Sequence, residues 1–304
     1  MLNIRNLEKS YGAFNVLSGL NMSVNKGDVY GFLGTNGCGK TTTMNIICNI
    51  LHKDTGEITF GKEDIKIGYL PESPALYDYM TGFEYLDFIA ACCEYEGDVK
   101  KRTAEVLQIT GMYSSASRRI KTYSRGMNQR VGIAAAIYSD PDLLILDEPT
   151  SALDPEGRAE VMEIISRLAM AGSTIILCTH ILTDVERVAN KIGIISGGVM
   201  AYEGALAELK RTFGTDNAVT VRPKPGSDIG EALQGIEIIN HKTVESYGDV
   251  TFYAKEGVAE AELFYKIVTT LAEKQIVPEG VWFRRLSLEQ IYLGITSGST
   301  VPGL

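Results

Sequence analysis

A glycine-rich loop pattern near the N-terminus constrains the fold of this chain more than any other feature. Residues 34–41 have the order Gly-x-x-x-x-Gly-Lys-Thr, which is the phosphate-binding loop pattern. The apolar run 29–33 before it predicts a buried strand. The apolar periodicity after it predicts a helix from about Lys40 to Leu51, with Ile50 among its inward residues. A turn that binds nothing is the plain alternative, and the strand–loop–helix context disfavours it.

The chemistry of such a loop points to a nucleoside triphosphate with Mg²⁺. Its glycines let backbone N–H groups point inward around an oxyanion, and the helix that follows adds about half a positive charge at its N-terminus. Lys40 supplies a cation for the β- and γ-phosphates, and Thr41 supplies a hydroxyl for Mg²⁺. The residues predicted to hold the triphosphate here are Gly34, Thr35, Asn36, Gly37, Cys38, Gly39, Lys40, Thr41 and Thr42.

Two adjacent carboxylates follow a second apolar run, residues 143–146. A strand that ends beside the phosphate loop can present one carboxylate to the metal and the next to the γ-phosphate. We therefore expect Asp147 to hold Mg²⁺ and Glu148 to activate or orient the attacking water. Two solvated carboxylates at a strand end are the alternative, which the upstream Lys40 and Thr41 disfavour.

Composition narrows the class of protein. The length of 304 residues and the 45% hydrophobic content predict one large or two ordinary domains with a sizeable core. The net charge of −9 argues against a nucleic-acid binder. No apolar run approaches the roughly 20 residues of a membrane span, and no secretion signal is recognisable, so we expect a cytoplasmic chain. Five cysteines without a Cys-x-x-Cys pair favour reduced thiols.

The pattern of elements predicts two domains, residues 1–213 and 214–304. The first begins with short antiparallel strands, contains a helical insert over about 73–123, and returns to buried parallel strands. This predicts an α/β phosphate-loop fold with a mixed sheet. The second domain has the expected order βαββαβ, which predicts a small α+β module of ferredoxin-like type.

Five motifs in order resemble those of the ATP-binding subunits of ABC transporters, over residues 1 to about 205. They are the combined Walker B and D-loop at 147–154, the signature segment at 123–130, the switch histidine in 178–180, the Q-loop at 68–76 and the aromatic Tyr11. The signature variant is similar to that of antibiotic, bacitracin-type and sodium exporters. The resemblance implies an ABC ATPase fold.

The resemblance also implies roles for residues outside the loop. Tyr11 would stack on adenine, and His180 would donate to the γ-phosphate and sense it. Without the resemblance, these two would be a strand-end aromatic and a structural histidine. Ser124 and Gly126 open a helix whose first N–H groups form a second anion site. One chain cannot wrap both sites around one phosphate, so the resemblance implies a head-to-tail dimer that places each ATP between two copies.

Two positions depart from the family pattern. Glu72 occupies the Q-loop position that is usually Gln. We expect Glu72 to lie close to the metal and to act as a hinge to the helical insert. Tyr123, Arg125 and Met127 replace commoner signature residues, so only Ser124 and Gly126 are carried over there.

Cys38 lies within the phosphate loop, just before the helix. A thiol at a helix N-terminus has a lowered pKa if it is exposed. We therefore hypothesise that alkylation of Cys38 blocks nucleotide binding and that ATP protects against it.

These expectations combine into a transport ATPase. Two copies, or one copy and a related subunit, would close on two MgATP and drive a separate integral membrane permease, with export favoured. The chain would then lie on the inner face of the cell membrane, where the insert 73–123 would meet the permease. One alternative is a non-transport ABC ATPase acting on ribosomes or DNA, although the chain has one phosphate loop and no heptads. Another is a regulatory ATP-binding subunit, which the intact Lys40, Asp147, Glu148 and His180 disfavour.

Overall fold

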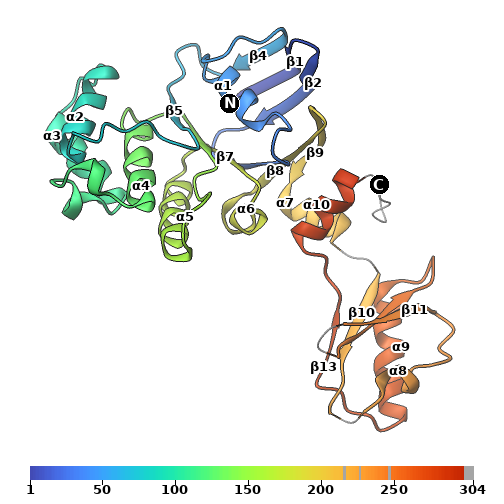
Figure 1. The fold of residues 1–304 in the computed structure, drawn as a ribbon. Helices are drawn as coiled ribbons and strands as arrows, with labels where there is room; N and C mark the ends of the chain where they lie inside the picture. Colours follow the sequence, from blue (N-terminus) through green and yellow to red (C-terminus); the bar gives the residue numbers. More distant parts are fainter. Residues whose placement is uncertain (215–216, 226, 246–247, 298–304) are drawn as a thin grey trace. The chain divides into compact units, whose positions relative to one another are not determined.

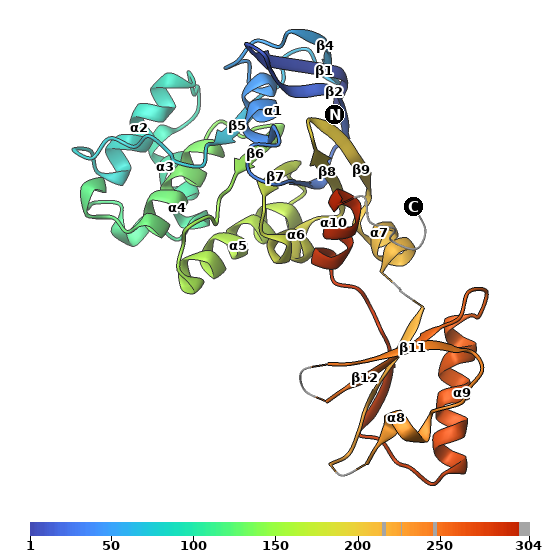
Figure 2. The same ribbon diagram turned by 45° about the vertical axis from the view of Figure 1, so that its right-hand side comes forward.

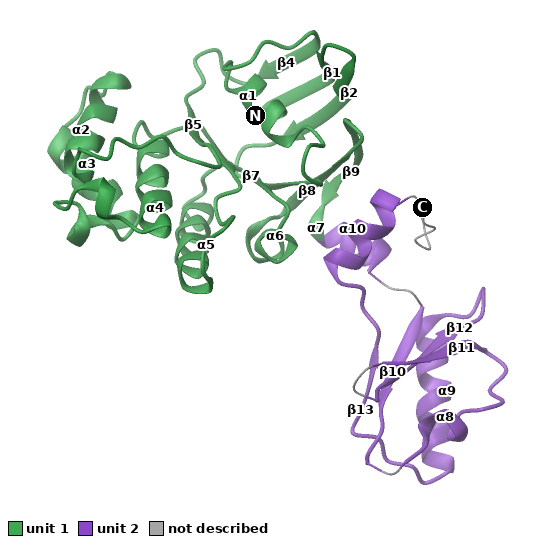
Figure 3. Cartoon of the chain, viewed as in Figure 1, with its two compact units in different colours: residues 1–206 green, residues 207–304 purple. Residues whose placement is uncertain are grey.

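The computed structural model describes residues 1–214, 217–225, 227–245 and 248–297. The chain packs as two compact units, residues 1–206 and 207–304 (Figure 3). The predicted division after residue 213 differs from this one by a short helix, α7 (Leu206–Phe213).

A six-stranded sheet forms the centre of the first unit (Figure 1). Its order is β5-β6-β7-β3-β8-β9. The first five strands of that order are parallel, and β9 closes the edge antiparallel to β8. Strands β3, β6 and β7 are buried at every residue, as expected for a sheet covered on both faces. The predicted mixed sheet is confirmed. The bounds are β3 (Val29–Leu33), β5 (Ile67–Leu70), β6 (Leu143–Asp147), β7 (Ile175–Thr179), β8 (Lys191–Ser196) and β9 (Val199–Ala205).

A three-stranded antiparallel sheet packs against the same core. It consists of β1 (Leu2–Tyr11), β2 (Phe14–Val24) and β4 (Thr55–Phe60), in the order β2-β1-β4. Its buried side chains share one hydrophobic cluster with β3 and with helix α1 (Lys40–Ile47). Helix α1 is shorter than predicted, because it ends at Ile47. The expectation that Ile50 faces inward is wrong, since Ile50 is 65% exposed.

Helices carry the rest of the first unit. Thr81 and Glu84 form a capping box that starts α2 (Gly82–Cys92), and α3 (Val99–Ile109) follows. Two short 3-10 turns lead into α4 (Arg125–Ala136), which Ser124 caps. The segment 73–123, predicted as a helical insert, contains α2, α3 and the two 3-10 turns. After β6, Asp154 and Pro155 start α5 (Pro155–Met170), and α6 (Leu182–Val188) follows β7.

The second unit has its own sheet (Figure 2). It also has its own cluster of buried hydrophobic side chains. The four strands are antiparallel in the order β11-β12-β10-β13, and helix α9 packs on one face with the short α8. Among the described residues, no helix combines the length and apolar character needed to cross a membrane. The bounds are β10 (Ala218–Arg222), α8 (Ile229–Ala232), β11 (Ile239–Val244), β12 (Val250–Ala254), α9 (Glu260–Glu273), β13 (Gly280–Phe283) and α10 (Leu288–Ser297).

Candidate functional site

The loop between β3 and α1 has a backbone shape that demands glycine. Gly37 and Gly39 have positive φ angles of 80° and 110°. A Cβ on Gly34 would lie 2.4 Å from the Cys38 sulfur and 2.7 Å from the Ile195 side chain, so a larger residue would not fit. Gly39 caps α1 without any side-chain hydrogen bond, which leaves the first N–H groups of the helix for an anion.

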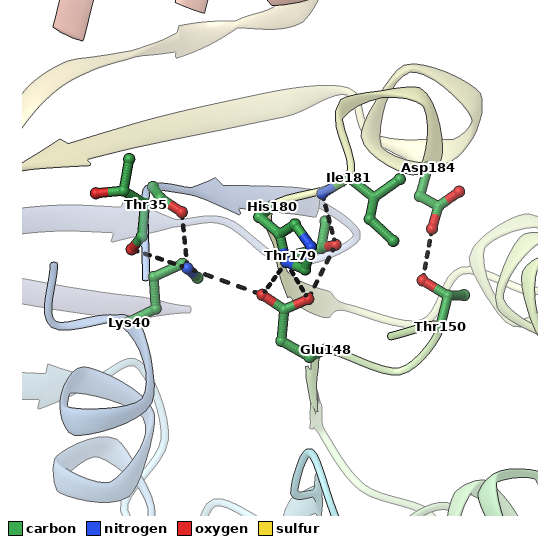
Figure 4. A network of polar contacts seen from close by, with 9 residues as sticks. Thr35, Lys40, Glu148, Thr150, Thr179, His180, Ile181 and Asp184 are labelled. Carbon is green, nitrogen blue, oxygen red and sulfur yellow. Dashed lines mark hydrogen bonds and ion pairs between the residues drawn. The ribbon is translucent and has the colours of Figure 1, made fainter. Parts of the chain in front are cut away.

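Lys40 is the first residue of α1, and its ammonium group is held over the loop (Figure 4). Its Nζ donates to the carbonyl oxygen of Gly34 at 2.7 Å and to that of Thr35 at 3.3 Å. The same nitrogen lies 3.8 Å from Glu148 Oε1. The cation therefore stands between the loop backbone and a carboxylate from the next part of the site.

Glu148 and His180 meet where β6 and β7 end. The backbone N–H of Glu148 donates to the Cys178 carbonyl at 2.8 Å, which extends the strand pairing by one residue. Beyond it, His180 Nδ1 lies 2.9 Å from Glu148 Oε2 and 3.0 Å from Oε1 (Figure 4). The Glu148 side chain is buried, whereas His180 is half exposed. The sequence prediction that these two residues belong to one site agrees with this geometry.

Asp147 is a buried carboxylate near the Thr41 hydroxyl. It is 0% exposed, and neither carboxylate oxygen accepts a hydrogen bond of normal geometry from the described residues. Burial raises its pKa, as do the charges of Glu148 and Glu72, while the Thr41 hydroxyl and the Lys40 ammonium oppose that rise. Buried polar groups are normally satisfied, and Mg²⁺ takes carboxylate and hydroxyl oxygens. Asp147 and Thr41 therefore fit a divalent cation.

These elements enclose one cavity of about 510 Å³ beside the loop. The predicted site residues that line it are Asn36, Gly37, Gly39, Lys40, Thr41, Thr42, Glu72, Glu148 and His180. Other predicted residues do not line it, namely Tyr11, Gly34, Thr35, Cys38, Ser124, Gly126 and Asp147. Of these, Gly34, Thr35, Cys38 and Asp147 are close neighbours of the lining residues in the chain.

The aromatic residue at the cavity is Phe14, which the sequence motifs do not identify. Phe14 is 66% exposed and lines the cavity together with Val16 and Ser151. Tyr11 lies opposite Phe14 in the β1–β2 hairpin, is 52% exposed, and has Lys9 Nζ 5.6 Å from its ring centre. Gly12 is the sequence signal that could have indicated Phe14, because the turn at Gly12 brings Tyr11 and Phe14 opposite each other.

Ser124 and Gly126 lie at the start of α4, outside this cavity. The Ser124 hydroxyl accepts a hydrogen bond from the Met127 N–H at 3.2 Å. A Cβ on Gly126 would lie 3.6 Å from the Gly157 Cα, so α4 and α5 approach closely at this point. The chain therefore does not bring its own signature residues to its own phosphate loop.

The thiol of Cys38 is buried within the phosphate loop. Its side chain is 8% exposed, and burial raises its pKa, while Lys40 opposes the rise. The lowered pKa was expected only for an exposed thiol, and this condition is not met, because the group is enclosed in the loop rather than presented to solvent. The hypothesis that alkylation of Cys38 blocks nucleotide binding stays a prediction.

The sequence profile of the ABC transporter family matches residues 17–151. The linearmycin resistance ATP-binding protein LnrL of Bacillus subtilis is 32% identical over 97% of this chain and 98% of its own length. The lantibiotic transport ATP-binding protein SrtF of Streptococcus pyogenes is 39% identical over 71% of this chain and 93% of its own. The bacitracin transport ATP-binding protein BcrA of Enterococcus faecalis is 37% identical over 69% of this chain and 71% of its own length.

Solved structures show the same fold for the first unit. An ATP-binding subunit of an ABC transporter superposes with a TM-score of 0.63 at 28% identity, over 70% of this chain and 93% of that chain. The cassette MJ0796, solved as a dimer with ADP and phosphate, superposes with a TM-score of 0.61 at 24% identity, over 68% of this chain and 99% of that chain. These coverages match the extent of the motifs.

Proposed function

Because the chain belongs to the ABC transporter family as an ATP-binding protein, we propose that it forms a dimer that binds ATP with Mg²⁺ and powers export through a separate membrane permease. The resemblance found in the sequence motifs is confirmed by the full-length match to LnrL. The chain is therefore an ATPase of a transport system.

The observation that carries the proposal is the group of three charged or polar side chains at the cavity. Lys40 Nζ lies 3.8 Å from Glu148, and His180 lies 2.9 Å from the same carboxylate. Lys40 binds the β- and γ-phosphates, Glu148 orients and activates the attacking water, and His180 donates to the γ-phosphate. The enclosed position of Glu148 supports its role as a base.

Asp147, Thr41 and Glu72 would hold Mg²⁺. The ion neutralises charge on the β- and γ-phosphates when it is bound. The unpartnered oxygens of Asp147 support this assignment. Thr41 and Glu72 line the cavity, so both can reach an ion within it.

The nucleotide site is completed by a second copy, or by a related ATPase subunit. Ser124 and Gly126 lie outside the cavity of their own chain, while the start of α4 offers N–H groups to an anion. In the dimer, this helix start faces the γ-phosphate held by Lys40 of the other copy and stabilises the charge that develops there.

The exported compounds are antimicrobial. The support comes from relatives named for linearmycin resistance, lantibiotic transport and bacitracin transport. The helical insert containing α2 and α3 docks on the permease, and the chain works on the inner face of the membrane. Residues 1–213 form the ATPase domain in this proposal.

Residues 214–304 form an accessory domain of ferredoxin-like type. From β10 to β13, the elements follow the order βαββαβ, and α10 comes after them. The sheet order from one edge to the other is β13-β10-β12-β11, which is the fourth, first, third and second strand along the chain, and every neighbouring pair is antiparallel.

The test uses the purified full-length chain and Glu148→Gln. Wild-type protein with MgATP is expected to release phosphate, whereas Glu148→Gln binds ATP but hydrolyses it at least about 10²–10⁴-fold more slowly and elutes as a dimer. Lys40→Ala serves as a second variant that fails to bind ATP productively. Absence of turnover by the wild type would favour a regulatory subunit, and purification with ribosomes or DNA instead of a permease would favour the non-transport alternative.

A further inference from the structure

A buried carboxylate ties the loop after Glu148 to the helix after His180. Asp184 lies on α6, is 4% exposed, and uses both of its oxygens. Its Oδ2 accepts a hydrogen bond from Thr150 Oγ1 at 2.6 Å (Figure 4). Its Oδ1 accepts from Arg158 Nε at 2.9 Å and from Nη2 at 2.6 Å. One side chain thus joins the loop after β6, helix α5 and helix α6.

The loop that Thr150 anchors has an unfavourable backbone. Glu148 and Ala152 have positive φ angles of 49° and 55°, which residues with a Cβ rarely adopt. Such conformations persist only where the surroundings hold them. Thr150 lies between these two residues and is 2% exposed, so its hydrogen bond to Asp184 is placed to hold the strained segment.

Two hydrogen bonds flank the contact between His180 and Glu148. On one side, the Glu148 N–H donates to the Cys178 carbonyl, where the pairing of β6 with β7 ends. On the other side, Thr150 donates a hydrogen bond to Asp184. Thr150 lies two residues after Glu148, and Asp184 lies four residues after His180. The Glu148 carboxylate itself also accepts a hydrogen bond from Thr179 Oγ1 at 3.4 Å, so the Thr150–Asp184 hydrogen bond holds the loop that follows Glu148 rather than the carboxylate directly.

Arg158 is the ion-pair partner of Asp184. A buried carboxylate needs a partner, and the Arg158 guanidinium supplies it from α5. Its Nη2 also donates to Thr183 Oγ1 at 2.6 Å, on the exposed side of the pair. Thr183 therefore contacts Arg158 but lies outside the link from Asp184 to the strained loop.

We propose that Asp184 is a positioning residue, which acts through Thr150 to hold Glu148 against His180 in the geometry for hydrolysis. The inference rests on the proposed function, because it assigns to Asp184 the placement of the residue that activates water. Asp184 does not line the cavity, so it acts without touching nucleotide.

The test compares four variants of the full-length chain. Thr150→Val removes the hydroxyl donor with little change in shape. We expect kcat to fall about tenfold, a change equivalent to about 1.4 kcal/mol, with KM and the ATP dissociation constant within about twofold of wild type. Asp184→Asn should lower kcat at least as far. Thr150→Ser keeps the donor and should recover kcat to within about threefold of wild type, and Thr183→Val is the matched control with unchanged kcat.

A double-variant cycle separates one shared pathway from two local effects. If Thr150 and Asp184 act through one hydrogen bond, Thr150→Val with Asp184→Asn should lose no more kcat than Asp184→Asn alone. Unchanged kcat in Thr150→Val, multiplied losses in the double variant, or failure of Thr150→Ser to recover would overturn the inference. The proposed function has separate tests, because it depends on ATP turnover by the wild type and on the loss of turnover in Glu148→Gln. It would therefore stand even if one of these outcomes overturned the role of Asp184.

Discussion

At the residue scale, the burial of Asp147 bears on its proposed role as a metal ligand. Its carboxylate is fully buried, and its oxygens have no hydrogen-bond partner among the described residues. Such a group costs stability in the folded chain and gains a ligand when a metal binds. The same residue therefore limits the stability of the nucleotide-free protein and supports its chemistry.

The direction of the Asp147 pKa gives a test. Burial raises its pKa, so the folded state binds the proton more tightly than the unfolded chain. This contribution to stability is present at low pH and is lost as pH rises through the folded pKa. At neutral pH, Asp147→Asn is therefore expected to raise the melting temperature of the nucleotide-free chain by about 2–4 °C per kcal/mol recovered.

Calorimetry at pH 7 without nucleotide measures that shift, and Mg²⁺-dependent turnover should be lost in the same variant. Asp64→Asn is the matched control, because Asp64 is exposed. A melting temperature that falls in Asp147→Asn would contradict the explanation.

Cys38 gives a second prediction at this scale. Burial raises the pKa of its thiol, so little thiolate forms near neutral pH and reaction with iodoacetamide should be slow. Exposed Cys92 should be alkylated well before Cys38 at pH 7.5, and the Cys38 rate should increase as pH rises. Peptide mass spectrometry over time measures both rates. Equal rates at the two cysteines would show that the loop opens readily.

At the scale of elements, patterns among neighbouring residues predicted helices and strands, whereas contacts between residues far apart in the sequence were not predicted. The strand 29–33 follows from the apolar pattern along the chain, and the structure has it where the sequence predicts. The end of α1 was missed because Asn49 takes a positive φ, which apolar periodicity does not indicate. The place of Phe14 depends on pairing across the β1–β2 hairpin.

The link between Thr150 and Asp184 could not be predicted for a similar reason. The two residues are 34 positions apart, and nothing in the sequence near either one marks the other. The parallel pairing of β6 with β7 brings them together. The motifs therefore identify most of the residues at the cavity, whereas the contacts that hold them come from the sheet.

The start of α4 gives a prediction at this scale. Ser124 accepts the Met127 N–H, and replacing a capping serine by alanine costs about 0.5–2 kcal/mol. Ser124→Ala should also weaken ATP-dependent dimerisation and lower turnover, while ATP binding to the monomer stays unchanged, because Ser124 lies outside its own cavity.

Sedimentation with and without MgATP, together with binding of a fluorescent ATP analogue, separates these effects. Ser115→Ala, in the first of the two 3-10 turns before α4, is the control. A monomer of Ser124→Ala that binds ATP more weakly would place Ser124 in the site of its own chain.

At the scale of the whole molecule, the proposed reaction centre is shared between two copies. The cavity contains the phosphate loop, Glu148 and His180, but it contains neither Ser124 nor Gly126. Turnover should therefore depend on the concentration of protein as well as that of ATP.

Specific activity at saturating MgATP is expected to fall as the chain is diluted below its dimer dissociation constant. Phosphate release measured across a dilution series, with parallel sedimentation, tests this. Full specific activity in a strictly monomeric sample would contradict the shared centre.

Each of the two units closes a hydrophobic cluster of its own, one around β3 and α1 and the other beneath α9. A large-to-small substitution in either cluster is therefore expected to lower the stability of the unit that contains it.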